Sequence, residues 1–271
     1  MKYLIPVIAF LVCLKSSRAQ SPVSDTGTGV TVYLTFDDGP VKTSWHLVDL
    51  IRADSLPVTV FLVGRYVFTS STGMSIFQYY RDNPVVEIAN HSYSHARNKY
   101  KKYYAKPGQV VSDILKNEDS LHLREKIVRL PGRNTWRING RQRTDLTDTR
   151  LAADSLMKLG YRIFGWDAEW RYDTASQSYL TARQLISVMD FLIRHHCSFT
   201  PGHIVILCHD IMLGDDWARQ QMGLLITEIR ARNWKMMTLR DYPGCRDSQP
   251  VLFETLRVNN FFLPKFLLQH L

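Results

Sequence analysis

The sequence contains no internal repeat, no low-complexity tract and no apolar run long enough to cross a bilayer comfortably. These absences exclude a solenoid, a biased linker-like chain and a multi-span helical membrane protein. Cysteine is also scarce, with 4 in 271 residues. What is present, 45% apolar and 11% aromatic residues, suffices for one large core, and a barrel of about 250 residues can be a single domain.

The N-terminus has the pattern of a secretory signal peptide. Lys2 precedes an apolar run over residues 3–14, and small residues stand at positions 17 and 19, where a signal peptidase reads them. We therefore predict that residues 1–19 are a signal peptide. The chain would be exported, to the periplasm, the cell envelope or the medium, with no stable membrane insertion after cleavage. An uncleaved membrane anchor is the alternative, because Lys15 and Arg18 are unusual in a cleavage region.

The rest of the chain divides into three parts. Residues 20–29 are predicted to be a flexible lead-in, residues 30–242 the folded domain, and residues 243–271 an extension that packs on it. Cleavage after Ala19 would leave an odd number of cysteines, which permits one disulfide at most. The sequence does not select the pair among Cys197, Cys208 and Cys245.

Positive charge is concentrated in one segment. The formal net charge is +9, and residues 1–19 hold three cations and no acid, so the mature chain carries 9 − 3 = +6. Residues 97–106 interleave tyrosines with Arg97, Lys99, Lys101, Lys102 and Lys106. Such a segment can face an anionic polymer, for example a cell-wall glycan, or be a solvated loop. Without a nucleic-acid-binding motif in an exported chain, we predict no nucleic acid partner.

Apolar and amphipathic stretches alternate along the domain, which predicts an α/β fold. Runs such as Val-Thr-Val-Tyr-Leu lack polar alternation, as parallel strands covered on both faces do. We predict a distorted (β/α) barrel with about seven parallel strands; an open doubly wound sheet is the alternative. The strands are expected at residues 30–36, 58–63, 85–89, 126–130, 161–166, 203–208 and 235–239. The helices are expected at residues 43–54, 109–121, 148–159, 182–195 and 216–232.

Polar clusters follow five of these strands at their carboxyl ends, which converge on one face of a parallel barrel. Two of the clusters supply metal ligands. His91 and His95 are four residues apart, and Asp38 ends another strand. Two imidazoles and a carboxylate make a three-ligand site with room for water, so we predict that these residues bind a divalent metal ion. Surface histidines without a metal are the alternative.

The adjacent carboxylate is predicted to be the general base. Neighbouring side chains on a turn diverge, so Asp37 can take a proton from water while Asp38 binds the metal. Arg129 at the end of an apolar strand needs a carboxylate partner, and Asp37 is the candidate. The sharp turn after Pro131 places Gly132, whose N–H can help to bind an oxyanion.

The late histidine, His209, is predicted to be the general acid, because an imidazole suits protonation of an amine near neutral pH. It needs an orienting carboxylate. Asp167 is the first choice, with Asp210 and Glu169 as rivals. Leu207 lies two residues earlier and points the same way along a strand, so it is either core or one wall of a small pocket for a methyl group.

Two tryptophans flank Asp167, and an indole either stacks on a sugar ring or fills the core. Trp170 lies beyond the predicted strand end, whereas Trp166 lies within it. We therefore predict that Trp170 faces the substrate.

Two of the clusters carry a family resemblance. Thr35–Gly39 reads T-F-D-D-G, and His91–His95 reads H-S-Y-S-H. With them the chain resembles the polysaccharide deacetylases of NodB-homology type, carbohydrate esterase family 4, over residues 30–242. The resemblance implies the roles given above and a metal ion that is usually zinc. The third motif of the family carries an aromatic residue before its glycine that this chain lacks, and the fourth is one residue shorter here.

The predicted function is metal-dependent de-N-acetylation of N-acetylated sugars in a glycan such as chitin or peptidoglycan. An O-acetyl esterase acting on a polysaccharide such as xylan would need the same site. A small-molecule amidase and a non-catalytic glycan-binding protein are further alternatives, although Asp37 and His209 have no use in binding alone. The sequence predicts no particular oligomeric state.

Overall fold

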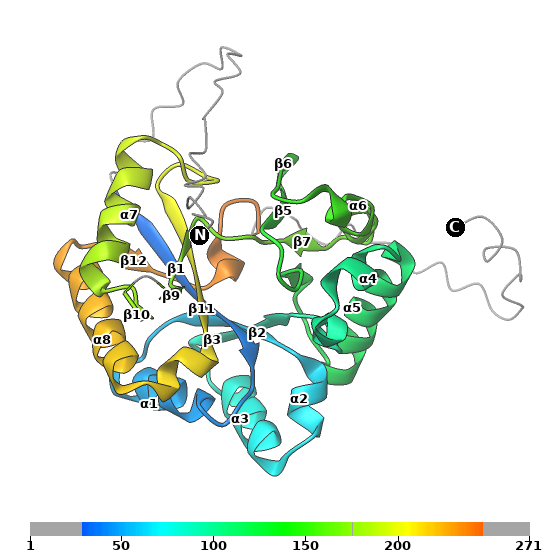
Figure 1. Cartoon of the computed structure of the whole chain (residues 1–271), viewed down its shortest axis with the longest axis horizontal. Helices are drawn as coiled ribbons and strands as arrows, with labels where there is room; N and C mark the ends of the chain where they lie inside the picture. The colour runs from blue at the N-terminus through cyan, green and yellow to red at the C-terminus, as the bar shows by residue number, and fades with distance from the viewer. Residues whose placement is uncertain (1–28, 175, 246–271) are drawn as a thin grey trace, which may run out of the picture.

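The computed structural model describes residues 29–174 and 176–245 (Figure 1). The predicted signal peptide, the lead-in apart from Gly29 and the extension beyond residue 245 lie outside the described residues. Within the described part of the chain, no helix is both long and apolar enough to span a membrane.

One curled sheet forms the centre of the molecule (Figure 1). Its strand order is β6-β5-β7-β4-β3-β2-β1-β11-β8, and β12 pairs with β1. All its pairings are parallel except those of β5 with β6 and β7. The predicted distorted (β/α) barrel is confirmed, with a sheet that ends at β6 and β8. The strands are β1 (Thr31–Gly39), β2 (Val58–Leu62), β3 (Val86–Asn90), β4 (Ile127–Val128), β5 (Thr135–Ile138), β6 (Arg141–Thr144), β7 (Arg162–Ile163), β8 (Ala168–Glu169), β11 (His203–His209) and β12 (Lys235–Met236). A separate two-stranded sheet pairs β9 (Tyr172–Asp173) with β10 (Ser178–Tyr179).

Helices cover the outside of the sheet (Figure 1). The five predicted helices are present as α1 (Ser44–Asp54), α5 (Pro107–Leu121), α6 (Arg150–Lys158), α7 (Ala182–Arg194) and α8 (Asp216–Ala231). The sequence prediction missed α2 (Gly64–Phe68), α3 (Ser71–Asp82) and α4 (Tyr100–Tyr104). Short 3-10 turns are η1 (His95–Asn98), η2 (Thr147–Thr149), η3 (Asp210–Gly214) and η4 (Leu239–Asp241).

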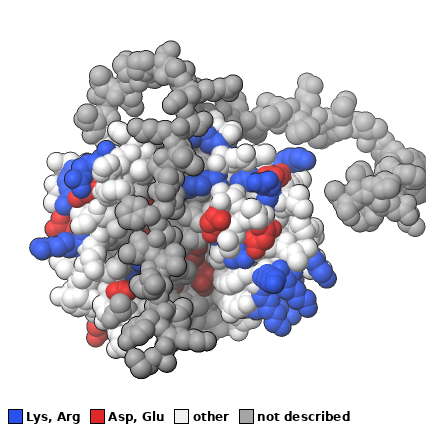
Figure 2. All heavy atoms as spheres, turned by 45° about the horizontal axis from the view of Figure 1, so that its top comes forward, with Lys and Arg blue, Asp and Glu red and all other residues white. Residues whose placement is uncertain are grey.

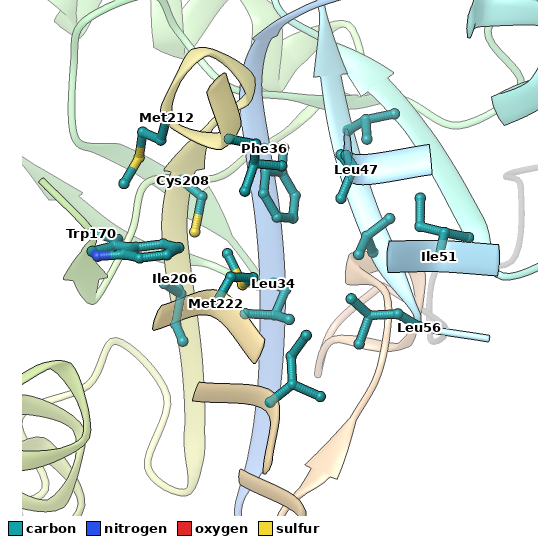
Figure 3. Packing of buried hydrophobic residues seen from close by; sticks show 14 of the residues in the cluster. Leu34, Phe36, Leu47, Ile51, Leu56, Trp170, Ile206, Cys208, Met212 and Met222 are labelled. Carbon is teal, nitrogen blue, oxygen red and sulfur yellow. The ribbon is translucent and has the colours of Figure 1, made fainter. Parts of the chain in front are cut away.

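Alternation along β1 separates two apolar clusters. Leu34 and Phe36 point outward and pack under the helices with residues of β11 such as Ile206 and Cys208 (Figure 3). Tyr33 points inward and joins an aromatic cluster at the amino-terminal end of the barrel interior. This inner cluster includes Phe61, Trp136, Phe164, Phe199 and Tyr242. The barrel interior is therefore packed with aromatic side chains at one end, where Thr59 and Glu87 are bonded to each other, and the polar cluster that includes Asp37 lies at the carboxyl end.

The structure bears on the question of which cysteines could form a disulfide. Cys208 is fully buried in the outer cluster, whereas Cys245 belongs to the inner one. Cys208 takes part in no disulfide among the described residues. Burial raises the pKa of the Cys208 thiol well above its ordinary value, so this side chain behaves as a small apolar group.

Candidate active site

The end of β1 presents two carboxylates in different directions. Asp37 pairs in register with His209 of β11, and a register shift against β2 falls between Asp37 and Gly39. Asp38 is the extra residue of this bulge, with a left-handed φ of 69°. A Cβ on Gly39 would lie 2.5 Å from the Asp210 carboxylate, so the next position accepts only glycine without rearrangement. The T-F-D-D-G sequence thus encodes the bulge.

Asp38, His91 and His95 come together, and their ligand atoms all lie within 4.8 Å of one another. Asp38 Oδ1 is 2.9 Å from His95 Nε2 and 3.2 Å from His91 Nε2. The other ring nitrogens face acceptors: His91 Nδ1 is 2.9 Å from the Arg129 carbonyl oxygen, and His95 Nδ1 is 3.2 Å from Asn98 Oδ1. Donation from both Nδ1 atoms leaves both Nε2 lone pairs directed at one point.

Three observations fit this cluster to a divalent cation. The ligand atoms are two imidazole nitrogens and one carboxylate oxygen, a set typical of catalytic zinc. Asp38 Oδ1 is buried and accepts no hydrogen bond from the described residues. Burial raises the pKa of Asp38, but the adjacent His91 and His95 imidazoles outweigh that effect, so the pKa falls far below its ordinary value. The site therefore offers an ionised carboxylate with an unused ligand atom.

The structure brings Arg129 to Asp37. Arg129 is completely buried, and its Nη1 donates to Asp37 Oδ1 at 2.8 Å and to Thr35 Oγ1 at 2.7 Å. Its Nη2 donates to the Gly165 carbonyl at 2.8 Å. The other Asp37 oxygen, Oδ2, is 3.6 Å from His91 Nε2. Arg129 thus fixes one oxygen of Asp37 and leaves the other facing the metal ligands.

His209 lies on another side of the same cluster. It ends β11, its Nε2 is 3.9 Å from Asp38 Oδ2, and its side chain is 32% exposed. Leu207 lies two residues earlier on the same face, in register with Thr35, and is 3% exposed. His209 thus presents a partly exposed imidazole on the same face of β11 as the buried Leu207 side chain.

The structure does not bring Asp167 to His209. The Asp167 carboxylate accepts from the backbone N–H groups of Phe199 at 2.6 Å and Val205 at 3.0 Å. Val205 precedes His209 by four residues of an extended strand, so the Val205 and His209 backbone positions are about 13 Å apart. Burial raises the pKa of Asp167, although these hydrogen bonds and Arg143 oppose that rise. Asp167 therefore holds the β11 and 199 segments together, contrary to its predicted role.

Of the two rivals, Glu169 has the better position. It pairs in register with Leu207, so it shares the barrel-facing side on which His209 lies. Asp210 is buried behind the Asp38 loop, where it accepts a hydrogen bond from the Ser44 hydroxyl. Side chains of paired residues in a parallel sheet point to the same face, so Glu169 is on the same face as His209, the predicted acid.

The prediction that Trp170 faces the substrate is wrong. Trp170 is 1% exposed, and Figure 3 shows its indole among Ile206, Cys208 and other outer-cluster residues. Its Nε1 donates to the Leu180 carbonyl at 2.7 Å. Trp166 is the partly exposed indole, with its ring centre 5.9 Å from the Arg129 guanidinium carbon.

Gly132 lies beneath an aromatic ring that the sequence reading missed. Gly132 has a φ of 63°, and a Cβ there would lie 3.1–3.4 Å from ring atoms of Tyr100. The Tyr100 ring also meets His95 edge to face, with centroids 5.8 Å apart. Burial and then Asp38 raise the pKa of Tyr100, which keeps its hydroxyl protonated. Tyr100 of α4 occupies the surroundings of the third motif, where this chain lacks the family's aromatic residue.

Residues 24–145 match the sequence model of the family described as polysaccharide deacetylase. That range contains Asp37, Asp38, His91, His95 and Arg129. No curated protein matches the chain.

Solved structures match most of the chain. A Streptococcus mutans CE4 esterase is 19% identical with a TM-score of 0.60, covering 77% of this chain and 85% of the other. The catalytic domain of a peptidoglycan N-acetylglucosamine deacetylase from Eubacterium rectale is 19% identical with a TM-score of 0.58, covering 82% and 93%. A mutant of a CE4 family pseudoenzyme is 16% identical with a TM-score of 0.51, covering 78% and 66%. At these identities the likeness establishes the fold.

Proposed function

Because the chain carries a NodB-homology polysaccharide deacetylase domain, we propose that it removes acetyl groups from N-acetylated sugars of a glycan, releasing acetate and a free amine. One observation supports the proposal most directly. The Asp38, His91 and His95 ligand atoms converge within 4.8 Å, with Asp37 on one side and His209 on another. Binding a glycan needs none of these five groups, whereas hydrolysis of an amide uses all of them.

Asp38, His91 and His95 would hold a divalent ion, and their mixed nitrogen and oxygen donors favour zinc. When bound, such an ion polarises the acetyl carbonyl and lowers the pKa of a coordinated water. The chain's own contribution is to keep both imidazoles in the tautomer that presents Nε2, through the Arg129 carbonyl and the Asn98 side chain.

Asp37 acts as the general base in this proposal. Its free oxygen lies beside the metal ligands, so it takes the proton of the attacking water. Arg129 orients Asp37 and balances its charge, since loss of either partner would leave a buried charge uncompensated. The Gly132 turn is retained as a candidate oxyanion donor, and Tyr100 adds a neutral hydroxyl near the same place.

His209 acts as the general acid and protonates the departing amine nitrogen. Its partial exposure lets it regain a proton from solvent after each turnover. Glu169, on the same side of the sheet, replaces Asp167 as the proposed orienting carboxylate. Leu207 supplies the apolar wall for the acetyl methyl group, and Trp166 replaces Trp170 as the proposed sugar contact.

The decisive experiment measures acetate released from a panel of acetylated glycans before and after treatment with a chelator. We expect release from N-acetylated oligosaccharides, its loss with chelator and its return with zinc. Asp37→Asn should lower kcat by about a hundredfold or more. Activity that is indifferent to the chelator, or full activity of Asp37→Asn, would contradict the mechanism. No release from any glycan by the zinc-loaded protein would favour a non-catalytic role like that of the pseudoenzyme.

An O-acetyl esterase is the second candidate, since one similar structure is described as a CE4 esterase. The two differ in their need for an acid, because an alkoxide leaves more easily than an amine anion. His209→Ala should therefore reduce acetate release from an N-acetylated glycan far more than from an O-acetylated xylan. Equal losses on both substrates, with the xylan preferred by the unaltered protein, would favour the esterase.

The site of action is proposed to be outside the cytoplasm. Wall glycans lie beyond the inner membrane, and residues 1–19 have the signal pattern described above. Expression in the native host followed by N-terminal sequencing should find the chain outside the cytoplasm, beginning at Gln20. A cytoplasmic protein that still begins at Met1 would contradict export.

A further inference from the structure

A strip of positive charge borders the site. We define the basic strip as Arg97, Lys99, Lys101, Lys102 and Lys106, all of them exposed, in a segment with no acidic residue. Within residues 29–174 and 176–245, none of the five forms an ion pair. Figure 2 shows Lys and Arg side chains gathered on the side of the molecule where α4 and α5 lie. Unpaired cations held this close together repel one another, which favours an anionic partner.

Tyrosines hold this charge outward. Tyr103 donates its hydroxyl to Asp113 of α5 at 3.0 Å, and Tyr104 donates to the Pro131 carbonyl at 2.7 Å. Tyr100 packs over Gly132 and against His95. With these three side chains turned toward the protein, the lysines of α4 have only solvent to face.

A strained turn places the strip directly beside the metal ligands. Four consecutive residues, His95 to Asn98, have φ between 47° and 57°, none of them glycine. A left-handed run of this kind is costly and persists only where the surrounding structure requires it. The turn begins at a metal ligand and leads directly into α4, so the strip starts at the rim of the site.

We propose that the basic strip binds anionic groups of the glycan strand whose acetylated sugar occupies the site. The substrate class is thus a glycan with carboxylate or phosphate groups, and this assignment rests on the proposed function. Nucleic acid fits the strip less well, because single-strand binding relies on exposed aromatic rings for stacking. The tyrosines of α4 are all packed against the protein.

The test compares a neutral β-1,4-linked N-acetylglucosamine hexamer with the same hexamer after partial carboxymethylation. Binding to the full chain is measured by titration calorimetry, and acetate release is followed separately. The carboxymethylated hexamer should bind more tightly. That preference should fade as salt rises from about 0.1 M to about 1 M, where the screening length falls from about 10 Å to about 3 Å.

Two matched triple variants locate the effect. Lys99→Ala/Lys101→Ala/Lys102→Ala should weaken binding of the carboxymethylated hexamer about tenfold, since each exposed contact contributes modestly. Its effect on the neutral hexamer should be much smaller. Arg124→Ala/Lys158→Ala/Lys235→Ala removes three exposed cations at the opposite edge of the barrel and should change neither affinity more than about twofold. The corresponding Lys→Arg triple in the strip should bind like the unaltered protein.

Equal binding of the two hexamers, or equal losses in the two alanine triples, would overturn the proposal. Single-stranded DNA that competes as well as the carboxymethylated hexamer would overturn the glycan assignment. The outcome is separable from the proposed function. If the protein binds the anionic hexamer through the basic strip but releases no acetate, the strip binds an anionic glycan and the proposed deacetylase function is wrong.

Discussion

The adjacent carboxylates of Asp37 and Asp38 point in different directions because Asp38 has a left-handed backbone conformation. Asp37 remains in the strand and points into the barrel toward Arg129, whereas the left-handed φ of 69° at Asp38 turns the next side chain toward the histidines. Such a conformation costs an aspartate of order 1–3 kcal/mol and is common at functional sites. The strained bulge at the end of β1 thus allows Asp37 and Asp38 to have the two different roles proposed for them.

Gly39→Ala should disturb this bulge. A Cβ there would lie 2.5 Å from Asp210 Oδ2 and 3.4 Å from Leu62, so we expect about 1–3 kcal/mol of lost stability. Acetate release should fall with it, because Asp38 shares the turn. Gly223→Ala is the control, since nothing lies within 4 Å of that Cβ in α8, and it should stabilise the protein by about 0.5–1 kcal/mol. Urea unfolding measures both, and equal effects would contradict the packing argument.

Asp210 should make stability depend on pH. Burial raises its pKa from 3.8 to about 7, with Asp38 and Asp37 adding to the rise and Ser44 opposing it. Between these values the folded state keeps a proton that the unfolded chain releases, so stability falls as pH rises. Relative to the unaltered protein, chelator-treated Asp210→Asn should gain up to about 4 kcal/mol from pH 4 to pH 7.

Urea unfolding across that pH range provides the measurement. Asp49→Asn is the control, because Asp49 lies on the exposed face of α1. Its stability difference from the unaltered protein should stay nearly constant with pH. An Asp210→Asn difference that is equally flat would show that Asp210 does not hold the proton.

The sequence predicted those residues of the candidate site whose role follows from their chemical type and from their position at the end of a strand. The metal ligands follow from residue type and position after two strands. Asp167 faces the barrel interior as His209 does, but β8 pairs with β11 so that Asp167 lies level with Val205. Trp170 was misplaced because the predicted strand ended at Trp166, whereas β8 is a separate strand at Ala168–Glu169. A change of one residue in strand parity moves a side chain to the other face of a sheet. That parity depends on pairing with β11, which local sequence does not record.

At the scale of elements, long periodic segments could be predicted and short ones could not. The helices α5 and α7 appear where the apolar spacing placed them. The hairpin of β5 and β6 was missed, although Asn139-Gly140 is a typical signal for a two-residue turn and both residues have positive φ. Its strand β6 is charged and partly exposed, so it lacks the apolar pattern on which the reading relied. In α3, aromatic residues that favour strands are buried by tertiary packing.

The 3-10 turn η1 links metal binding to α4 through one side chain. Asn98 Oδ1 is 3.2 Å from His95 Nδ1 and fixes the tautomer that presents Nε2. Asn98→Ala should weaken zinc binding about tenfold, at the lower end for a lost partner of a ligating histidine. Asn98→Asp keeps the acceptor and should bind zinc as tightly as the unaltered protein or more tightly. Competition with a chromophoric chelator measures both, and equal weakening would rule out the acceptor role.

In the whole molecule, the metal ligands come from separate parts of the sheet. Asp38 is the penultimate residue of β1, and His91 and His95 follow β3, with β2 between these strands. The approach of three polar groups at the open end of the interior contrasts with the aromatic packing at the other end. A cation bound here would connect β1 to the segment after β3. Its binding free energy therefore adds to the stability of the folded chain.

Zinc should accordingly raise the midpoint of thermal unfolding. A ligand at a hundredfold excess over its Kd stabilises the folded state by about 2.7 kcal/mol, which for a domain of this size corresponds to roughly 5–10 °C. Asp38→Asn removes the ionised ligand and should lose most of this shift, because two imidazoles alone hold the ion weakly. Calorimetry of the chelator-treated chain, with and without zinc, measures the difference. Magnesium at the same concentration should give a smaller shift, since it prefers oxygen ligands. An equal zinc-induced shift in Asp38→Asn would show that the ion binds elsewhere on the molecule.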